Sequence, residues 1–227
     1  MINFDSLTHT YTNNSGEIYE SVSQLLGKYK KPFDTDFYSS IVAKKRGISQ
    51  EVVKEEWKQN TENACAFGKD VHAVVENYLK TGIVDEQNII NEFQKVFSYK
   101  RIDVRSEIIL WNDTHKIAGT SDIIVDVDDK SFDVLDIKTN KKFDFYNKYN
   151  ETLLKPLEHL HNCKYSTYGI QLSLYAYMYA AMTGKKPRQL AVLYWNKVAF
   201  EKYYVPYMFW DVSVLLKHYS KQPTINN

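Results

Sequence analysis

The sequence is poor in cysteine, proline and glycine, with 2, 5 and 8 of them among 227 residues. Cys65 and Cys163 are too few for a four-cysteine iron–sulfur cluster, and we expect reduced thiols in a cytoplasmic protein. No run is apolar enough to span a bilayer, and residues 1–5 show neither the basic nor the apolar region of a secretion signal. We therefore expect no membrane attachment. A G-x-x-x-x-G-K-[ST] loop is also absent, which excludes a fused helicase motor.

A large excess of charge of one sign is missing too. The chain has 29 Lys and Arg against 28 Asp and Glu, so its net charge of +1 gives no strong field toward nucleic acid. Any such affinity must come from local clusters. The chain does have 44% hydrophobic residues, with 18 tyrosines and 11 phenylalanines, which is enough for a substantial core. We expect one globular domain over residues 1–227.

The spacing of apolar residues predicts a chain that contains both helices and strands. Residues 1–20 are expected to form a small hairpin, and the tail from residue 220 to be frayed. Capping residues and hydrophobic periodicity predict helices at residues 22–26, 50–57, 61–80, 85–99, 168–182 and 209–219. Alternating or continuous apolar runs predict strands at residues 104–111, 190–195 and 200–205.

Residues 118–138 organise the rest of the chain, because their alternating pattern predicts a β-hairpin with charged side chains at one end. If the polar turn is centred on Asp129, Asp122 lies opposite Asp136, with Cβ atoms about 4.5–5.5 Å apart. Two such carboxylates repel each other unless a divalent cation binds them. Lys138 shares a strand face with Asp136. The hairpin therefore predicts a site with a metal ion and an ammonium group.

Three further motifs stand around the DIK sequence of this hairpin in a fixed order. They are GTSD at its first strand, GKDVHAVVENYL upstream and QLSLY downstream, and the side chains they supply are Asp122, His72, Gln171 and Tyr175. A three-residue pattern alone occurs often by chance, but the ordered set on suitable elements is much more specific. This set resembles the PD-(D/E)xK nuclease superfamily, in its RecB-like and lambda-exonuclease-like branch.

The resemblance implies a restriction-endonuclease-like α/β fold, in which helices flank a central mixed β-sheet and the hairpin lies at its middle. Within one nuclease domain, residues 1–60 would form an N-terminal hairpin and helices. Residues 61–205 would form the catalytic core, and residues 206–227 a C-terminal helix and tail.

The resemblance also implies metal-dependent hydrolysis of DNA phosphodiesters. Asp122, Asp136 and Lys138 would be catalytic. The metal ligands would be His72, both aspartates and the backbone carbonyl of Ile137. Two Mg²⁺ or Mn²⁺ ions would neutralise the phosphate and acidify the attacking water. Lys138 would hold that water and the scissile phosphate, and would act as a base only if a neighbouring metal lowers its pKa.

Three side chains near this site have a structural interpretation beside the functional one. His72 shares a helix face with Val75 and Leu79, where a histidine is more often a core residue than a ligand. Glu76, one turn later, would either orient the imidazole or be an exposed or structural residue. Glu107, on the strand before the hairpin, either lies near the metals, as an acidic residue does in several relatives, or faces solvent.

The connection over residues 139–169 mixes basic and aromatic residues, a composition that suits single-stranded nucleic acid because bases stack and phosphates meet lysine. The alternative is a flap whose aromatics pack down. Its candidate DNA-binding residues are Lys141, Lys142 and Lys148. The basic cluster at residues 28–46 is either a solvated surface or a phosphate contact. The resemblance implies that Gln171 and Tyr175 also contact DNA.

The branch consists mostly of DNA exonucleases, so we expect digestion of linear DNA from its ends. The expected setting is recombination, repair or phage DNA metabolism, in the cytoplasm of a bacterial or phage-infected cell, with a recombination protein as a candidate partner. A structure-specific endonuclease of the same fold and a non-catalytic DNA-binding or recombination-complex module remain alternatives. The presence of every expected catalytic side chain favours an enzyme.

Overall fold

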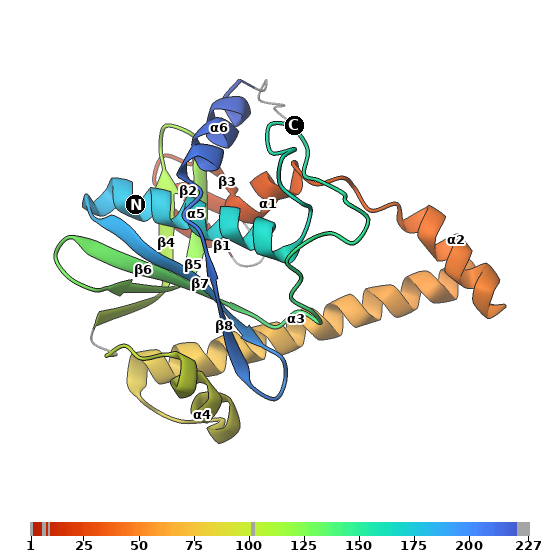
Figure 1. Ribbon diagram of the computed structural model, residues 1–227, viewed down its shortest axis with the longest axis horizontal. Coiled ribbons are helices and arrows are strands. Elements are labelled where there is room, and N and C mark those ends of the chain that lie inside the picture. The colour runs from red at the N-terminus through yellow and green to blue at the C-terminus, as the bar shows by residue number, and fades with distance from the viewer. Residues whose placement is uncertain (1, 6–7, 9, 101–102, 222–227) are drawn as a thin grey trace.

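The computed structural model describes residues 2–5, 8, 10–100 and 103–221 and shows an eight-stranded mixed sheet (Figure 1). Neighbouring strands follow the order β1-β2-β3-β5-β6-β7-β8, and β4 pairs with β5. The β3–β5 and β6–β7 pairs are parallel and the others antiparallel. The strands are β1 (Ile2–Asp5), β2 (Thr10–Asn13), β3 (Ile18–Ser21), β4 (Val104–Asn112), β5 (Ile117–Asp126), β6 (Ser131–Lys138), β7 (Lys186–Trp195) and β8 (Phe200–Val205).

Helices cover both faces of the sheet, because alternate side chains of its central strands point to opposite sides. One core joins Ile124 and Val134 to α1, α5 and α6, and the other joins Ile123 and Leu135 to α3 and α4. The predicted fold class, a central mixed sheet flanked by helices, is therefore confirmed. The helices are α1 (Val22–Gly27), α2 (Thr35–Arg46), α3 (Gln50–Thr81), α4 (Gln87–Val96), α5 (Lys164–Thr183) and α6 (Phe209–Tyr219).

One continuous helix, α3, replaces the two helices predicted at residues 50–57 and 61–80. The prediction of a break was wrong, because Thr61 does not cap a new helix. Its hydroxyl instead donates to the Trp57 carbonyl at 2.9 Å, within the same helix. The end of the helix is as predicted: Gly82 adopts the left-handed conformation with φ of 80°.

An arm projects from the sheet and was not predicted from the sequence. Helix α2 begins after the cap Asp34, ends at Gly47 with φ of 65°, and buries Ser39 and Ala43. It packs on the first half of α3, and Figure 1 shows the two helices extending together beyond the sheet. We call α2 and the first half of α3 the arm. The arm lies largely outside the main core.

The connection between β6 and α5, residues 139–163, is irregular apart from a bridge between Thr152 and His161. It is packed nonetheless, since Leu153 and Leu157 are buried in the core on the α5 side of the sheet. From residue 222 on, the C-terminal tail lies outside the described residues. Within the described part of the chain, no helix has the length and apolar character needed to cross a membrane.

Candidate active site

The β5–β6 hairpin has the register that the sequence predicts. Ile123 pairs with Leu135 and Asp126 with Phe132, which centres the turn on Asp129. Asp122 and Asp136 lie one position beyond the last paired residues. The two carboxylates are therefore at the open end of the ladder, where β5 and β6 stop pairing.

A break in pairing along β5 creates the space for the site. Ala118 still pairs with β3 and Ile123 pairs with β6, but residues 119–122 pair with neither strand. Here Asp122 Oδ2 accepts a hydrogen bond from the Ile137 backbone N–H at 2.7 Å. A side-chain carboxylate thus takes a place that a backbone carbonyl would occupy in a continuous ladder, and this bond joins the two strands at the site.

Asp136 and Lys138 form a buried ion pair on the face of β6 toward α5. The Asp136 side chain is 2% exposed and that of Lys138 is 20% exposed. Burial and the charge of Asp122 raise the pKa of Asp136 to about 6, although Lys138 opposes them. Burial disfavours the Lys138 ammonium, but the charges of Asp136 and Asp122 outweigh it and raise the pKa of Lys138. Apart from its contact with Lys138 Nζ, Asp136 Oδ2 has no hydrogen-bond donor among the described residues.

Three potential metal-ligating side chains converge from α3, β4 and β5. One donor atom each of His72, Glu107 and Asp122 lie within 4.8 Å of one another. His72 Nδ1 is 3.5 Å from Asp122 Oδ2, and His72 Nε2 is 3.0 Å from the Ile137 carbonyl oxygen. Opposed ligands of an ion such as Mg²⁺ are about 4.2 Å apart, twice the usual bond length. The distances among the three donor atoms are therefore close to those among the ligands of a single ion.

Glu107 reaches this cluster through an unusual backbone conformation. The β4–β5 register places it opposite Asp122, between the pairs Ser106–Ile123 and Ile108–Ser121, and its φ is 51°. A left-handed glutamate costs on the order of 1–3 kcal/mol and persists only where its surroundings enforce it. Burial, followed by the charge of Asp122, raises the pKa of Glu107 to about 7. Sequence periodicity could not reveal this bend.

Glu76 lies near the cluster but outside it. Its carboxylate forms an ion pair with Lys80, one turn along α3, and its charge helps to raise the pKa of Glu107. The ring nitrogens of His72 instead face Asp122 and the Ile137 carbonyl. The imidazole is therefore oriented from β5 and β6, while Glu76 adds negative charge from the side of α3.

Gln171 and Tyr175 connect α5 to the open stretch of β5. Tyr175 is only 5% exposed, and Gln171 Nε2 donates to its hydroxyl at 3.1 Å. A Cβ atom at Gly119 would lie 2.8 Å from the Tyr175 ring and 3.1 Å from Val22, so glycine is required there. Of the pair, Gln171 is the side chain with more access to solvent.

The candidate lysines of the 139–163 connection form no ion pair with the carboxylates of the site among the described residues. Lys141, Lys142 and Lys148 form no ion pair within the described residues, and Lys148 Nζ lies 4.6 Å from the Tyr149 ring centre. Sequence analysis missed Tyr168, whose ring centre is 5.0 Å from Lys138 Nζ. Tyr168 lies three residues before Gln171 and therefore on the same face of α5. That spacing could have predicted its place in the site.

The mixed sheet flanked by helices, with carboxylates, a histidine and a lysine at the open end of its central hairpin, agrees with the architecture of a nuclease. Residues 42–206 match the model of the PD-(D/E)XK nuclease superfamily, and the chain belongs to that superfamily. The chain is similar to the crystal structure of SSO0001, with 13% identity and a TM-score of 0.42 over 88% of this chain and 74% of that one. It is also similar to a protein from Eubacterium rectale provisionally named an exonuclease, with 13% identity, a TM-score of 0.37, and coverage of 88% and 77%. A search of curated protein sequences finds no match.

Nucleases of this superfamily use divalent metal ions, and the site fits such an ion. Carboxylate oxygens and an imidazole nitrogen are ligands that Mg²⁺ and Mn²⁺ accept. The buried Asp136 Oδ2 has only the Lys138 ammonium as a partner among the described residues, which leaves a lone pair for a cation. Burial raises the pKa values of Glu107 and Asp136, and the charge of Asp122 contributes to both shifts; a bound cation would offset that charge.

Proposed function

We propose that this protein is a metal-dependent deoxyribonuclease that digests linear DNA from its ends. The observation that carries the proposal is the convergence of three potential ligands, His72, Glu107 and Asp122, beside the buried Asp136–Lys138 pair. Negative groups that repel one another next to one ammonium group form a site prepared for a cation and a phosphate.

In this proposal His72, Asp122, Asp136 and the Ile137 carbonyl hold two Mg²⁺ or Mn²⁺ ions, and Glu107 completes the set. A bound divalent ion neutralises charge on the phosphate and lowers the pKa of water. The protein itself fixes the donors. Asp122 is held by the Ile137 backbone N–H at 2.7 Å, and His72 contacts the carbonyl of the same residue at 3.0 Å.

We assign to Lys138 the role of an ammonium donor that orients the attacking water and the scissile phosphate. Its raised pKa keeps it charged at neutral pH, so it donates hydrogen bonds rather than accepting a proton. Asp136 contacts Nζ, and the ring of Tyr168 lies 5.0 Å from it, so the ammonium group is restrained on two sides. Developing charge on the phosphate would then meet a preorganised donor.

DNA contacts are proposed along α5 and the connection before it. Gln171, held by the buried Tyr175 hydroxyl, would contact the strand near the scissile phosphate. Lys141, Lys142 and Lys148 would contact phosphates further along the strand. The end preference and a setting in DNA recombination, repair or phage DNA metabolism, with a recombination protein as partner, rest on the resemblance of the motifs around His72 and Gln171.

The test is incubation of end-labelled linear DNA and covalently closed circular DNA with Mg²⁺, Mn²⁺ or EDTA. We expect progressive loss of the linear DNA with either metal, little cutting of the circles, and no reaction in EDTA. The Asp122→Asn protein is the matched control for contaminating nuclease. Rapid metal-dependent cutting of circles would favour an endonuclease, and metal-independent binding without cleavage would favour a non-catalytic module.

A further inference from the structure

An aromatic cluster on the arm is largely exposed to solvent, although one of its rings, that of Phe33, packs on Trp57. Phe33, Phe37 and Tyr38 are 63%, 55% and 47% exposed. The rings of Phe33 and Tyr38 are stacked with centres 4.9 Å apart and planes 8° apart, and the ring of Phe37 meets Tyr38 edge-on at 5.2 Å. Exposed apolar groups gathered in this way mark a binding surface more often than isolated ones do.

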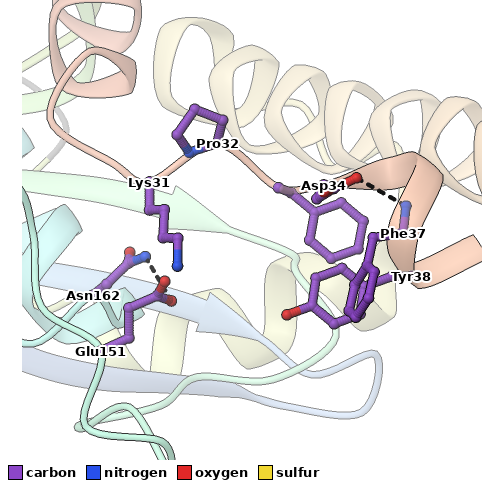
Figure 2. Close-up of a pocket in the computed structure, with 8 residues that line it drawn as sticks. Lys31, Pro32, Asp34, Phe37, Tyr38, Glu151 and Asn162 are labelled. Atoms are coloured by element: carbon purple, nitrogen blue, oxygen red, sulfur yellow. Dashed lines mark hydrogen bonds between the residues drawn. The ribbon is translucent and has the colours of Figure 1, made fainter.

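These rings form one wall of a pocket of about 500 Å³ between the arm and the 139–163 connection. Figure 2 shows Lys31 extending toward Glu151 and Asn162 on the opposite wall, with Phe37 and Tyr38 side by side. Pockets of this size accommodate small organic groups, and a few polar groups among apolar walls orient them. The pocket thus offers flat apolar surface on one side and hydrogen-bonding groups on the other.

Two lysines, Lys164 and the ion-paired Lys138, lie beside the ring of Tyr168 at the candidate active site. Lys138 Nζ is 5.0 Å from the Tyr168 ring centre, and Lys164 Nζ is 5.7 Å from the same centre. Lys30, next to the pocket residue Lys31 in the chain, is affected by the same charge: burial, and after it the charge of Lys164, lowers the pKa of Lys30. Within the described residues, neither the Lys30 nor the Lys164 ammonium group forms a salt bridge, although Asp144 accepts from the Lys164 backbone N–H at 3.2 Å. Ammonium groups near each other without a salt bridge favour an anion between them.

Resting on the proposed function, we infer that the arm binds the substrate strand. Phosphates of single-stranded DNA contact Lys30 and Lys164, and nucleobases stack in the pocket formed by Phe33, Phe37 and Tyr38. Lys164 beside Tyr168 and Lys31 in the pocket wall supply positive charge at both ends of the strand's path, which favours a polyanionic nucleic-acid strand over a protein partner.

The acidic residues of the pocket determine which part of the nucleotide enters it. Asp34 caps α2 by accepting from the Phe37 N–H at 2.8 Å, and Glu151 accepts from Asn162 Nδ2 at 3.4 Å. These two carboxylates outnumber the one ammonium group of the pocket wall, that of Lys31, so the pocket as a whole would repel a phosphate. A base has no charge and can donate amino protons to such oxygens. The pocket therefore receives the base, and the lysines outside it receive the backbone.

The first experiment measures binding of a fluorescein-labelled oligothymidylate by anisotropy in EDTA, which prevents cleavage. We expect the Phe33→Ala/Tyr38→Ala double variant to bind about tenfold more weakly or worse, with the salt dependence unchanged. The matched control is Trp210→Ala, which removes an aromatic side chain that is 78% exposed on α6. Equal affinity of wild type and the double variant would overturn the inference.

The second experiment separates the lysines from the rings. Lys30→Met and Lys164→Met should each reduce the slope of log affinity against log salt by about 0.7, the value for one phosphate on single strands. Lys217→Met on α6 should leave the slope unchanged. Because methionine keeps the apolar stem, the fold is preserved. An unchanged slope in both test variants would remove the lysines from the site.

Photocrosslinking then locates the bases. An oligonucleotide with 5-iododeoxyuridine should crosslink to the peptide that contains Phe33 and Tyr38. Crosslinks confined to other peptides would overturn the inference. It would also be overturned if the Phe33→Ala/Tyr38→Ala protein bound DNA normally but lost self-association or the binding of a protein partner. If wild type cleaves DNA but the variants bind normally, the inference alone fails. If wild type neither cleaves nor binds DNA, both proposals fail.

Discussion

Replacing Glu107 with glutamine should stabilise the metal-free protein above pH 7. The folded state raises the pKa of Glu107 from 4.5 to about 7, mainly through burial and then through the charge of Asp122. The corresponding stability is fully present below pH 4.5 and is lost as the pH rises through 7, because the unfolded state loses its proton first. Glutamine resembles the protonated acid, so the variant should escape this loss.

The size of the effect follows from the pKa difference. A rise from 4.5 to about 7 corresponds to about 3 kcal/mol at 1.36 kcal/mol per tenfold change. Glu107 is only partly buried, so solvent screening reduces this value to about 1–2 kcal/mol. For a chain of this length, the melting temperature should rise by about 2–8 °C.

The assay is thermal unfolding in EDTA at pH 5 and pH 8, with Glu62→Gln on the exposed surface of α3 as the control. The stabilisation of Glu107→Gln should be large at pH 8 and small at pH 5. Added Mn²⁺ should raise the melting temperature of wild type more than that of the variant, because binding stabilises only a folded site that retains its ligands. The same melting difference at both pH values, or equal stabilisation by Mn²⁺, would refute the role of Glu107.

Four other predictions test separate parts of the site. Lys138→Ala should lower nuclease activity at least about 100-fold with an unchanged near-ultraviolet circular dichroism spectrum, and wild-type activity would end its catalytic assignment. His72→Ala should weaken metal binding and lower the Mn²⁺/Mg²⁺ activity ratio; identical metal titrations would make His72 a core histidine. Neutralising the lysines at positions 141, 142 and 148 should flatten the salt dependence of DNA binding, and an unchanged slope would make their segment a structural flap. Gly119→Ala should reduce the free energy of unfolding by about 1–3 kcal/mol in urea titrations, since its methyl group would meet Tyr175; wild-type stability would contradict that contact.

The hairpin was predictable because strand periodicity and a short turn together determine register. With the turn at Asp129, the pairing of Ile123 with Leu135 follows, and so does the position of Asp122 near Asp136. The face that carries Asp136 and Lys138 follows from the same alternation. Strand alternation and turn length were sufficient to predict the hairpin, because no distant segment is needed to determine its register.

Other features depend on contacts that sequence periodicity does not contain. The φ of 51° at Glu107 arises where β4 faces the open stretch of β5. The burial of Tyr175 depends on Gly119, which lies 56 positions earlier in the chain. The continuity of α3 past Thr61 was missed because a threonine hydroxyl can either cap a helix or bond back to the preceding turn, and only the backbone decides between them.

The continuity of α3 fixes the separation between the arm and the metal-ligating residues. Trp57, whose ring lies 5.9 Å from that of Phe33, and His72 are on the same rigid helix. Their fifteen-residue separation corresponds to about 22 Å along the helix axis. At the spacing of about 3.4 Å per nucleotide in a helical strand, this is roughly six nucleotides. An extended single strand spans the same distance with fewer nucleotides. In either form the DNA must reach about 22 Å beyond the metal-ligating residues before the arm adds to its binding, so the helix sets a minimum substrate length.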